Sequence, residues 1–372
     1  MSPAPATRTH AVIAGGGTAG HVLPALAVAD ALVDRGHRVD EIHYIGARRG
    51  IEAELLPGTG YPHTLLDVVG LQRRMTIANL AFVPLLVRAV ARTRLLLRRL
   101  RPAVVVSVGG YASLPAVIAA RAARIPVVVV SYDRRPGRAS TLAARWAAAC
   151  AVAFPGSPLP RAVVTGAPVR RELLAVDRST DRVRARERLG VGAERFLVVV
   201  VGGSLGSGVL NSVTMRYLAE HADDMGLAVY HVTGRRSLGG TPLADAAETG
   251  GPWYRRVEFA NDMATLYAAA DLWLGRGGAS TVHEVAATGT PAVLVPWSGA
   301  AEDHQLDNVR WLSERGAAVL VDENDPEAVI AAIERLRHDV AARDELARRA
   351  HEAGAVHRRG GVATLIDSIA LA

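Results

Sequence analysis

A histidine directly follows a glycine-rich turn near the start of the chain. Residues 11–32 read AVIAGGGTAGHVLPALAVADAL, so Gly15, Gly17 and Gly20 have the G-x-G-x-x-G spacing of dinucleotide-binding turns, with His21 next. Backbone N–H groups at such a turn lie at the positive end of a helix dipole and suit phosphate oxygens. His21 could accept a proton from an incoming hydroxyl, since the reference pKa of histidine is about 6.5. A helix-capping or core histidine is the alternative interpretation.

Two further glycine turns come after apolar runs. Gly109 and Gly110 come after AVVVSV, and GGSLGSG comes after FLVVVV, in which 196–201 reads as a strand. Each turn taken alone is also consistent with a tight turn and nothing more. Together, three such turns in two parts of the chain predict phosphate groups on both sides of a cleft.

Dinucleotide binding requires an acidic residue at the end of the second strand, about 20 residues past the glycines. The sequence there is GARRG, with Arg48 and Arg49. These residues disfavour NAD and leave NADP open.

A carboxylate on a helix follows another glycine pair in ADLWLGRGGASTVHEVAATGTPAVLVP, residues 270–296. Glu284 lies one helical turn beyond the helix start, where it could accept two hydrogen bonds from a ribose diol. A solvent-exposed glutamate is the alternative interpretation. Asp303 and His304 are adjacent and cannot easily face one ion, and the sequence contains no Asp-x-Asp, so we expect no metal site.

Composition excludes several kinds of chemistry. All 43 basic residues are arginine, which excludes a Schiff-base lysine, and Cys150 is the only cysteine of the 372 residues, which excludes an internal disulfide. No long apolar run and no signal-peptide core is present, so we expect a cytoplasmic protein. Residues 1–175 carry 22 Arg against 9 acidic residues, whereas 176–372 carry 21 against 27. This asymmetry predicts an anionic surface or ligand for the first half, although a solvated basic face is an alternative.

The elements that must position these residues alternate between short apolar strands and amphipathic helices. This pattern predicts an α/β fold of two Rossmann-like domains with parallel sheets and a cleft between them. The expected domains are residues 1–166 and 167–352, with a helix in 353–372 that packs back on the first. We expect strands at 10–14, 41–45, 103–108, 125–130, 196–201, 227–232, 272–274 and 292–295, and helices at 21–34 and from about 209.

Residues 75–101 combine apolar side chains with arginines. Ile77, Leu80, Phe82 and Leu85 precede a segment that carries Arg88, Arg92, Arg94, Arg98 and Arg99. Such a segment could lie against anionic lipid, or it could be a helix pair on the sheet with a basic outer face.

Six motifs in order resemble the MurG family, the GlcNAc transferases that complete the lipid-linked peptidoglycan precursor. They are GGGTAGHVLPALAVADAL, SVGGYASLPA, GAPVR, VGGSLGSGVLN, EFANDMATLYAAADLWLGRGGASTVHEVAATGTPAVLVPW and HQLDN. The resemblance implies a GT-B fold and an inverting transfer of GlcNAc from UDP-GlcNAc to undecaprenyl-diphospho-MurNAc-pentapeptide. It further implies an N-terminal domain that meets the acceptor at the cytoplasmic side of an anionic membrane, with no cofactor and no nucleic-acid partner.

The same resemblance assigns site residues. His21 would be the base, Glu284 would bind the ribose, and Gln305 the GlcNAc. The acceptor diphosphate would meet Gly16, Gly17, Thr18, Gly109, Gly110 and Tyr111. The remaining donor contacts would come from Arg170, Gly203, Ser204, Gly278, Ala279, Ser280 and Thr281.

One motif departs from the family. After IPVVV the family commonly has His-Glu-Gln-Asn, and the positions here are Val130, Ser131, Tyr132 and Asp133, so Asp133 would help to hold the donor sugar. Leu205 replaces the usual glutamine of GGSQG. An alternative is therefore a MurG-like transferase with a different acceptor. An NADP oxidoreductase is a further alternative, which the lack of lysine and of a Ser-Tyr pair disfavours, and retention of His21 argues against a silent sugar-nucleotide binder.

Overall fold

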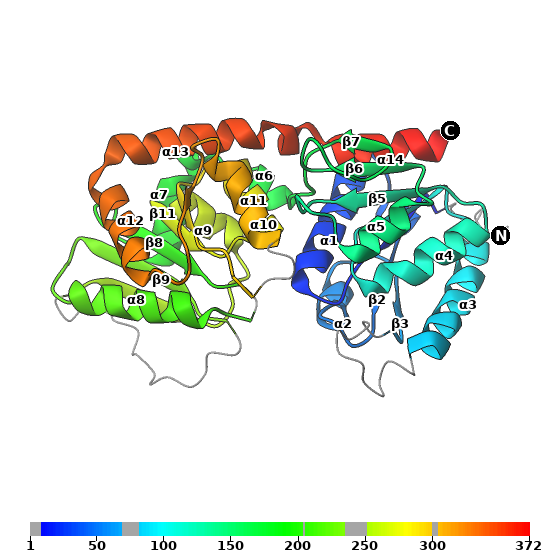
Figure 1. Cartoon of the computed structure of the whole chain (residues 1–372), viewed down its shortest axis with the longest axis horizontal. Helices are drawn as coiled ribbons and strands as arrows, with labels where there is room; N and C mark the ends of the chain where they lie inside the picture. Colours follow the sequence, from blue (N-terminus) through cyan, green and yellow to red (C-terminus); the bar gives the residue numbers. More distant parts are fainter. Residues whose placement is uncertain (1–8, 69–81, 204, 235–250, 300–303) are drawn as a thin grey trace, which may run out of the picture. The chain divides into compact units, whose positions relative to one another are not determined.

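The computed structural model describes residues 9–68, 82–203, 205–234, 251–299 and 304–372 (Figure 1). The chain divides into two compact units. The first comprises Met1–Arg171 together with Arg359–Ala372, and the second comprises Glu172–Arg358.

The first unit is built on a parallel sheet, which in the described residues has seven strands in the order β3-β2-β1-β4-β5-β6-β7. The strands are β1 (Ala11–Ala14), β2 (Ile42–Ala47), β3 (His63–Leu66), β4 (Val104–Ser107), β5 (Val127–Ser131), β6 (Ala149–Val152) and β7 (Ala162–Val164). The helices are α1 (Ala19–Asp34), α2 (Glu52–Leu55), α3 (Phe82–Leu100), α4 (Leu114–Ala122), α5 (Arg138–Ala144) and α14 (Gly361–Leu371), with short 3-10 turns η1 (Val39–Glu41), η2 (Leu56–Gly58) and η4 (Tyr111–Ser113).

The second unit repeats this plan with six described strands, also parallel, in the order β10-β9-β8-β11-β12-β13. The strands are β8 (Phe196–Val201), β9 (Leu227–Val232), β10 (Trp253–Val257), β11 (Leu272–Gly275), β12 (Ala292–Leu294) and β13 (Val319–Leu320). The helices are α7 (Arg178–Leu189), α8 (Gly208–Glu220), α9 (Met263–Ala269), α10 (Ala279–Thr288), α11 (His304–Ser313), α12 (Pro326–His338) and α13 (Val340–Ala353). Short helices α6 (Arg171–Leu174) and η6 (Gly354–Arg359) lie at the unit boundaries.

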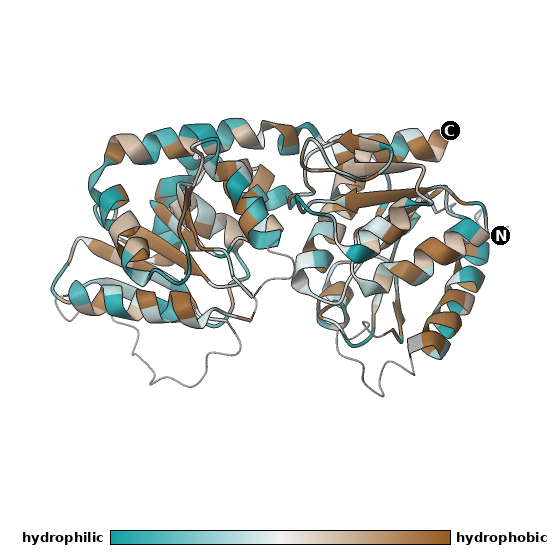
Figure 2. Ribbon diagram, in the orientation of Figure 1, coloured by the Kyte–Doolittle hydropathy of each residue, from teal (hydrophilic) through white to brown (hydrophobic). Residues whose placement is uncertain are grey.

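Runs of β-branched residues form these strands because both faces of a parallel sheet are covered by helices. β4 (VVVS) and β5 (VVVVS) are buried at every position. Figure 2 shows the strands as mainly apolar and the helices as mixed. The predicted α/β fold with two parallel sheets is confirmed, and the eight expected strands lie within two residues of observed ones. The sequence did not indicate β3, β6, β7, β10 or β13.

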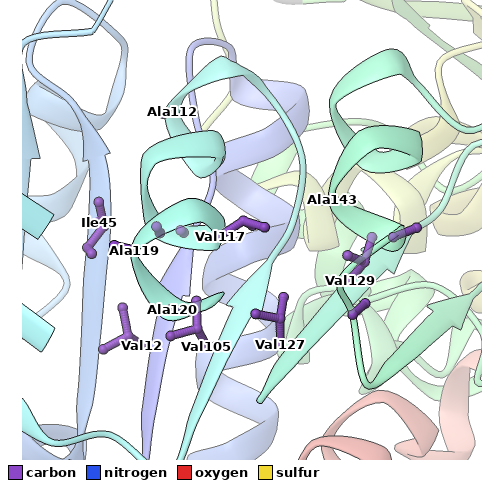
Figure 3. Close-up of a cluster of buried hydrophobic side chains, with 14 of the residues drawn as sticks. Val12, Ile45, Val105, Ala112, Val117, Ala119, Ala120, Val127, Val129 and Ala143 are labelled. Carbon is purple, nitrogen blue, oxygen red and sulfur yellow. The ribbon is translucent and has the colours of Figure 1, made fainter. Parts of the chain in front are cut away.

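One core of the first unit lies between its sheet and helices α3, α4 and α5. Val12, Val105 and Val127 project from three strands toward Val117 and Ala120 of α4 (Figure 3). The small residues on α4 let the helix approach the sheet closely, and the β-branched strand residues fill the space between them. A corresponding core in the second unit joins β8, β9, β11 and β12 to α8 and α12.

The C-terminal helix α14 packs in the first unit, against α1 and strands β4, β5 and β6. Asp367 fixes it there. Its Oδ1 lies 3.0 Å from His10 Nε2 and 2.9 Å from His37 Nε2, and its Oδ2 accepts a hydrogen bond of 2.5 Å from Arg35 Nε. Burial opposes ionisation of Asp367, but the bonds from Arg35 and His37 outweigh it and lower the pKa of the carboxyl.

Helix α3 is the described part of the arginine-rich segment. Ala89, Thr93 and Leu97 are buried on one face, whereas Val83 and Val87 are exposed on the other. Residues 75–81, with Ile77 and Leu80, lie outside the described residues. Among the helices that the structure describes, none is both long and apolar enough to span a bilayer.

Candidate active site

Four neighbouring strands of the first unit end at one edge of its sheet, where parallel α/β folds bind ligands. The adjacent order β2-β1-β4-β5 brings together the segments that come after these strands. They carry Glu52 after β2, the glycine turn after β1, Gly109–Tyr111 after β4, and Tyr132 after β5. The sheet topology therefore assembles residues from distant parts of the sequence. The hydrogen bond between Tyr132 and Gly20 of α1, for example, joins residues that are 112 positions apart.

The turn after β1 leads directly into α1. Thr18 is the N-cap residue in extended backbone, and its Oγ1 lies 3.1 Å from His21 Nδ1 rather than bonding a helix N–H. The Gly17 N–H donates to Glu52 Oε1 over 2.8 Å. The expectation of bare amides thus needs a correction at Gly17, whose amide is directed to a protein carboxylate and not toward a ligand.

The second glycine turn packs on the first. Gly110 has φ of 74°, and a Cβ at this position would lie 2.1 Å from the Gly16 carbonyl oxygen. The Tyr111 ring lies beside Gly17, where a Cβ would come within 2.6 Å of Tyr111 Cε1. Glycine is required at position 110 because its backbone touches that of Gly16, and at position 17 because the Tyr111 ring leaves no space for a Cβ. All six predicted acceptor residues therefore come together in one part of the first unit.

A pocket of about 260 Å³ opens beside these turns. His21, Gly109, Gly110 and Tyr111 line it together with segments 130–133 and 137–140. This volume is slightly below the usual range for small-molecule sites, so the pocket holds only part of a substrate. The pocket therefore exposes the predicted base next to the second glycine turn.

Burial and two carboxylates act in opposite directions on His21. Burial lowers its pKa, and the negative charges of Asp133 and Glu52 partly offset the effect. A lowered pKa keeps the imidazole neutral near pH 7, which is the form that accepts a proton. Tyr132, which also lines the pocket, donates a 2.6 Å hydrogen bond to the Gly20 carbonyl oxygen of α1.

In the second unit, helix α10 begins directly after the glycine pair that follows β11. Gly278 is its N-cap residue, so Ala279, Ser280 and Thr281 form the first turn and direct N–H groups out of the helix end. Glu284 is buried at 9% exposure, and its Oε2 accepts a 3.1 Å hydrogen bond from Tyr267 Oη. The alternative of a solvent-exposed glutamate is therefore wrong.

Gln305 lies in the first turn of α11, after β12. Its Oε1 accepts a 3.0 Å hydrogen bond from the Trp297 N–H, which fixes the loop that follows β12. The sequence did not indicate Glu323, which stabilises the same loop through a 2.6 Å bond from Ser298 N–H and a 2.6 Å ion pair with Arg276. Burial opposes ionisation of Glu323, but these donors lower its pKa below the usual value.

The turn after β8 is described in part. Gly203 has φ of 90°, and Ser204 lies outside the described residues. The helix after this turn is capped by Ser207, whose hydroxyl accepts from Leu210 N–H over 3.3 Å. This turn, the Gly278 turn and the segment that leads to Gln305 of α11 come after the adjacent strands β8, β11 and β12.

Two predicted donor residues belong to the first unit. Asp133 lines the pocket of His21, and Arg170 lies at the end of the first unit, one residue before its boundary. Glu52, Tyr132 and Arg138 are pocket or turn residues that sequence reasoning missed. A search four residues beyond Arg48 would have found Glu52, because it is the first acidic residue after the second strand.

Comparisons with known proteins agree with this architecture. Residues 11–152 match the glycosyltransferase family 28 N-terminal domain, and residues 197–360 match the glycosyltransferase family 28 C-terminal domain. The chain is similar to Acinetobacter baumannii MurG, with a TM-score of 0.71 and 27% identity over 97% of this chain and 99% of that one. Two α/β units with parallel sheets and this likeness define a GT-B glycosyltransferase.

Relatives place the chain more narrowly. It is 38% identical over 96% of its length to a protein of Clavibacter sepedonicus, 95% of which is covered, and 41% identical over 84% of its length to one of Nocardioides sp., 85% of which is covered. Both are named UDP-N-acetylglucosamine–N-acetylmuramyl-(pentapeptide) pyrophosphoryl-undecaprenol N-acetylglucosamine transferase. The chain belongs to the MurG family within glycosyltransferase family 28.

Proposed function

We propose that this protein transfers GlcNAc from UDP-GlcNAc to undecaprenyl-diphospho-MurNAc-pentapeptide, with inversion at the anomeric carbon. The observation that carries the proposal is the 38% identity over 96% of the chain to a relative named for this reaction. The pocket that exposes His21 beside the Gly109–Tyr111 turn supports it, because the reaction needs a base next to a phosphate-binding surface.

The first unit takes the acceptor in this proposal. The turns Gly16–Thr18 and Gly109–Tyr111 meet its diphosphate. Tyr111 and Thr18 contribute hydroxyl groups, while amides other than that of Gly17 remain to contact phosphate oxygens. The charge of residues 1–175 favours this assignment, because an excess of arginine attracts a diphosphate and an anionic surface.

The second unit takes the donor. Glu284 accepts hydrogen bonds from the ribose diol, and the first turn of α10, with Gly278 to Thr281, faces the nucleotide. Gln305 contacts the GlcNAc, and the Gly203–Ser204 turn and Arg170 bind the UDP phosphates. We assign Asp133 to the donor sugar because carboxylate oxygens accept hydrogen bonds from sugar hydroxyls.

The chemistry is a direct displacement. His21 Nε2 removes the proton from the attacking sugar hydroxyl as its oxygen bonds to the anomeric carbon, and the bond to the UDP oxygen breaks on the opposite face. The electron pair leaves with UDP, and the product has a β linkage. Arginine and helix N-terminal amides stabilise the negative charge of the leaving diphosphate.

The exposed face of α3 supports contact with a membrane surface. Val83 and Val87 are 62% and 63% exposed, and Leu95 is 56% exposed. The exposed arginines among them are Arg88, Arg92, Arg94, Arg98 and Arg99. Apolar side chains mixed with arginines bind the interface of anionic lipid. We infer a peripheral enzyme on the cytoplasmic face of the membrane, where a soluble nucleotide sugar is available.

A second candidate is the same donor chemistry with a different acceptor. Val130, Ser131, Tyr132 and Asp133 line the pocket of His21, at the positions where the family commonly has His-Glu-Gln-Asn. A changed pocket wall next to the base favours a changed acceptor, because substrate contacts there decide the specificity of transfer.

Calorimetric titration with UDP-GlcNAc, UDP-glucose and NADPH in parallel tests the donor. Selective binding of UDP-GlcNAc is the expected result, and binding of NADPH alone would contradict the proposal. Turnover with the undecaprenyl-linked acceptor then tests the reaction. A protein that binds UDP-GlcNAc selectively but leaves this acceptor unchanged would favour the second candidate.

A further inference from the structure

Glu52 is a fully buried acid beneath the glycine turn that precedes His21. It has 0% exposure, although glutamate is almost never fully buried unless it is paired. Its Oε1 accepts hydrogen bonds from Gly17 N–H over 2.8 Å and from Ala47 N–H over 2.9 Å. Its Oε2 has no hydrogen-bond partner among the described residues. Such an arrangement is unfavourable for stability, which suggests a function for the carboxylate.

The carboxylate occupies space that two glycines leave open. A Cβ on Gly16 would lie 1.8 Å from Glu52 Oε1, and a Cβ on Gly50 would lie 1.8 Å from Glu52 Oε2. The carboxylate therefore lies in contact with the glycine turn after β1 and with the Gly50 segment after β2. Both glycines are needed because no Cβ fits beside the buried carboxylate.

The residues that contact Glu52 also contact, or directly precede, residues of the acceptor pocket. Gly17, which donates to Glu52, precedes Thr18, whose hydroxyl lies 3.1 Å from His21 Nδ1. Gly16, which rests on Glu52, also touches Gly110 of the second turn. A displacement of the carboxylate would therefore move both turns and the ring of His21.

We propose that Glu52 is a positioning residue for the acceptor, whose buried carboxylate fixes the Gly15–Thr18 turn and, through it, Thr18 and His21. Glu52 is the first acidic residue after the second strand, but it lies beyond the position of the acid that binds ribose in dinucleotide folds, and it binds the turn of its own chain. The inference rests on the proposed function, because the turn is assigned there to the acceptor diphosphate.

A matched pair of glycine variants tests the proposal without changing the acceptor turn. Gly50→Ala displaces the carboxylate, and its backbone has no positive φ. Gly58→Ala is the control, because a Cβ there meets nothing within 4 Å. We expect Gly50→Ala to raise the KM for the lipid-linked acceptor by about tenfold or more, since small displacements near a reacting group have large effects. The KM for UDP-GlcNAc and the UDP affinity should stay as in the wild type, and Gly58→Ala should change neither KM.

Variants of the acid itself separate its shape from its charge. Glu52→Gln keeps an oxygen that accepts from Gly17 and Ala47, so it should retain the acceptor KM within about threefold. Glu52→Ala removes the acceptor atom and should raise that KM as Gly50→Ala does. If Glu52→Ala folds poorly, the folded fraction is measured by UDP titration and Gly50→Ala remains the deciding variant.

The outcomes also separate this inference from the proposed function. An unchanged acceptor KM in Gly50→Ala and Glu52→Ala would overturn the positioning role while the wild-type turnover stands. If the wild type does not use the lipid acceptor, titration of inorganic diphosphate at saturating UDP replaces turnover. Weaker diphosphate binding in Gly50→Ala than in Gly58→Ala then supports the role of Glu52, and equal binding overturns it.

Discussion

The two units share one topology and differ in the segments that connect their strands to the next helices. Both sheets run in the order third, second, first, fourth, fifth, sixth strand, and both place a glycine turn after the first. In the first unit that turn is held by Glu52 and precedes His21, whereas in the second it leads to a helix capped by Ser207. In the proposed function, one scaffold carries the base in one copy and the donor-binding groups in the other, so the sites and not the folds distinguish the two units.

The hydrogen-bond partners of the two buried glutamates, Glu52 and Glu284, differ between the units in the same way. Glu52 accepts backbone N–H groups and has both oxygens buried, so it stabilises the protein's own turn. Glu284 is almost as buried, but it accepts from a tyrosine hydroxyl on the neighbouring helix α9 near the start of α10. Burial alone therefore does not distinguish the carboxylate that binds the protein's own backbone, Glu52, from the one that we propose binds the ribose, Glu284.

The largest effect that tests the contrast between the units is expected from His21→Ala. Loss of the base should lower kcat by roughly 10²- to 10⁴-fold, the usual contribution of a general base. UDP affinity should be nearly unchanged, because His21 is not among the groups assigned to the donor and the ribose-binding Glu284 belongs to the second unit. Steady-state kinetics with the lipid acceptor and UDP titration measure both quantities, and a variant that keeps most of its turnover would remove the catalytic role of His21.

Glu284→Ala should produce the opposite pattern. We expect UDP affinity to fall by roughly 10- to 100-fold, because removal of a charged acceptor leaves the ribose hydroxyls without partners. Tyr267→Phe is the matched control, since it removes the 3.1 Å bond to Glu284 Oε2 and leaves the carboxylate in place. Equal losses in both variants would indicate that Glu284 stabilises α9 and α10 and does not bind the ribose.

The sequence predicted the scaffold better than the contacts within it. Runs such as FLVVVV and VVVVS are typical of strands that are buried on both faces of a parallel sheet. The sequence therefore located these strands correctly. The strands that were missed, such as β6 (ACAV) and β7 (AVV), are short, and β7 is exposed at the sheet edge. Their pairing depends on neighbours that a local pattern does not reveal.

The same limit applies to the site. The glycine turns and His21 are local patterns that the sequence shows directly. The contact between Gly110 and Gly16 depends on the order of the strands, which could be inferred only by assuming the ordinary Rossmann topology. The burial of Glu52 and Glu284 could not be predicted, because it depends on which side chains of distant segments enclose them. Composition favours an exposed position for both acids.

The stability of the protein at acid pH can be used to compare the two units. Each unit has a buried histidine in its sheet, and the pKa of that histidine is lowered. Burial and the neighbouring His63 lower the pKa of His43 in β2 to about 4, and burial and Arg256 lower that of His231 in β9 to about 4. Unfolding restores a pKa of about 6.5, so the unfolded chain binds more protons between pH 6.5 and 4. The contribution of these two histidines to stability is complete well above pH 6.5 and is lost as the pH falls toward 4.

At pH 5.5 each histidine should lower the free energy of unfolding by about 1.4 kcal/mol relative to pH 7.5. Urea unfolding at several pH values measures the loss. His43→Gln and His231→Gln should each reduce the loss of unfolding free energy between pH 7.5 and pH 5.5 by about 1.4 kcal/mol. A profile that stays equally steep in either variant would show that the corresponding histidine does not contribute.

The smallest effect is expected where α14 joins the first unit. Asp367→Asn removes the charge that accepts from His10, His37 and Arg35, and we expect a loss of about 1 kcal/mol, as for one partly buried hydrogen bond. Ser368→Ala, on the same helix, is the control, because among the described residues its hydroxyl bonds within α14, to the Leu365 carbonyl oxygen. Thermal unfolding and UDP titration are measured together.

If the two units are energetically separate, Asp367→Asn should lower the Tm and leave the UDP affinity unchanged, since α14 belongs to the first unit. A fall in UDP affinity would instead mean that the anchoring of α14 is energetically coupled to the donor site, and the two units could then no longer be treated as independent.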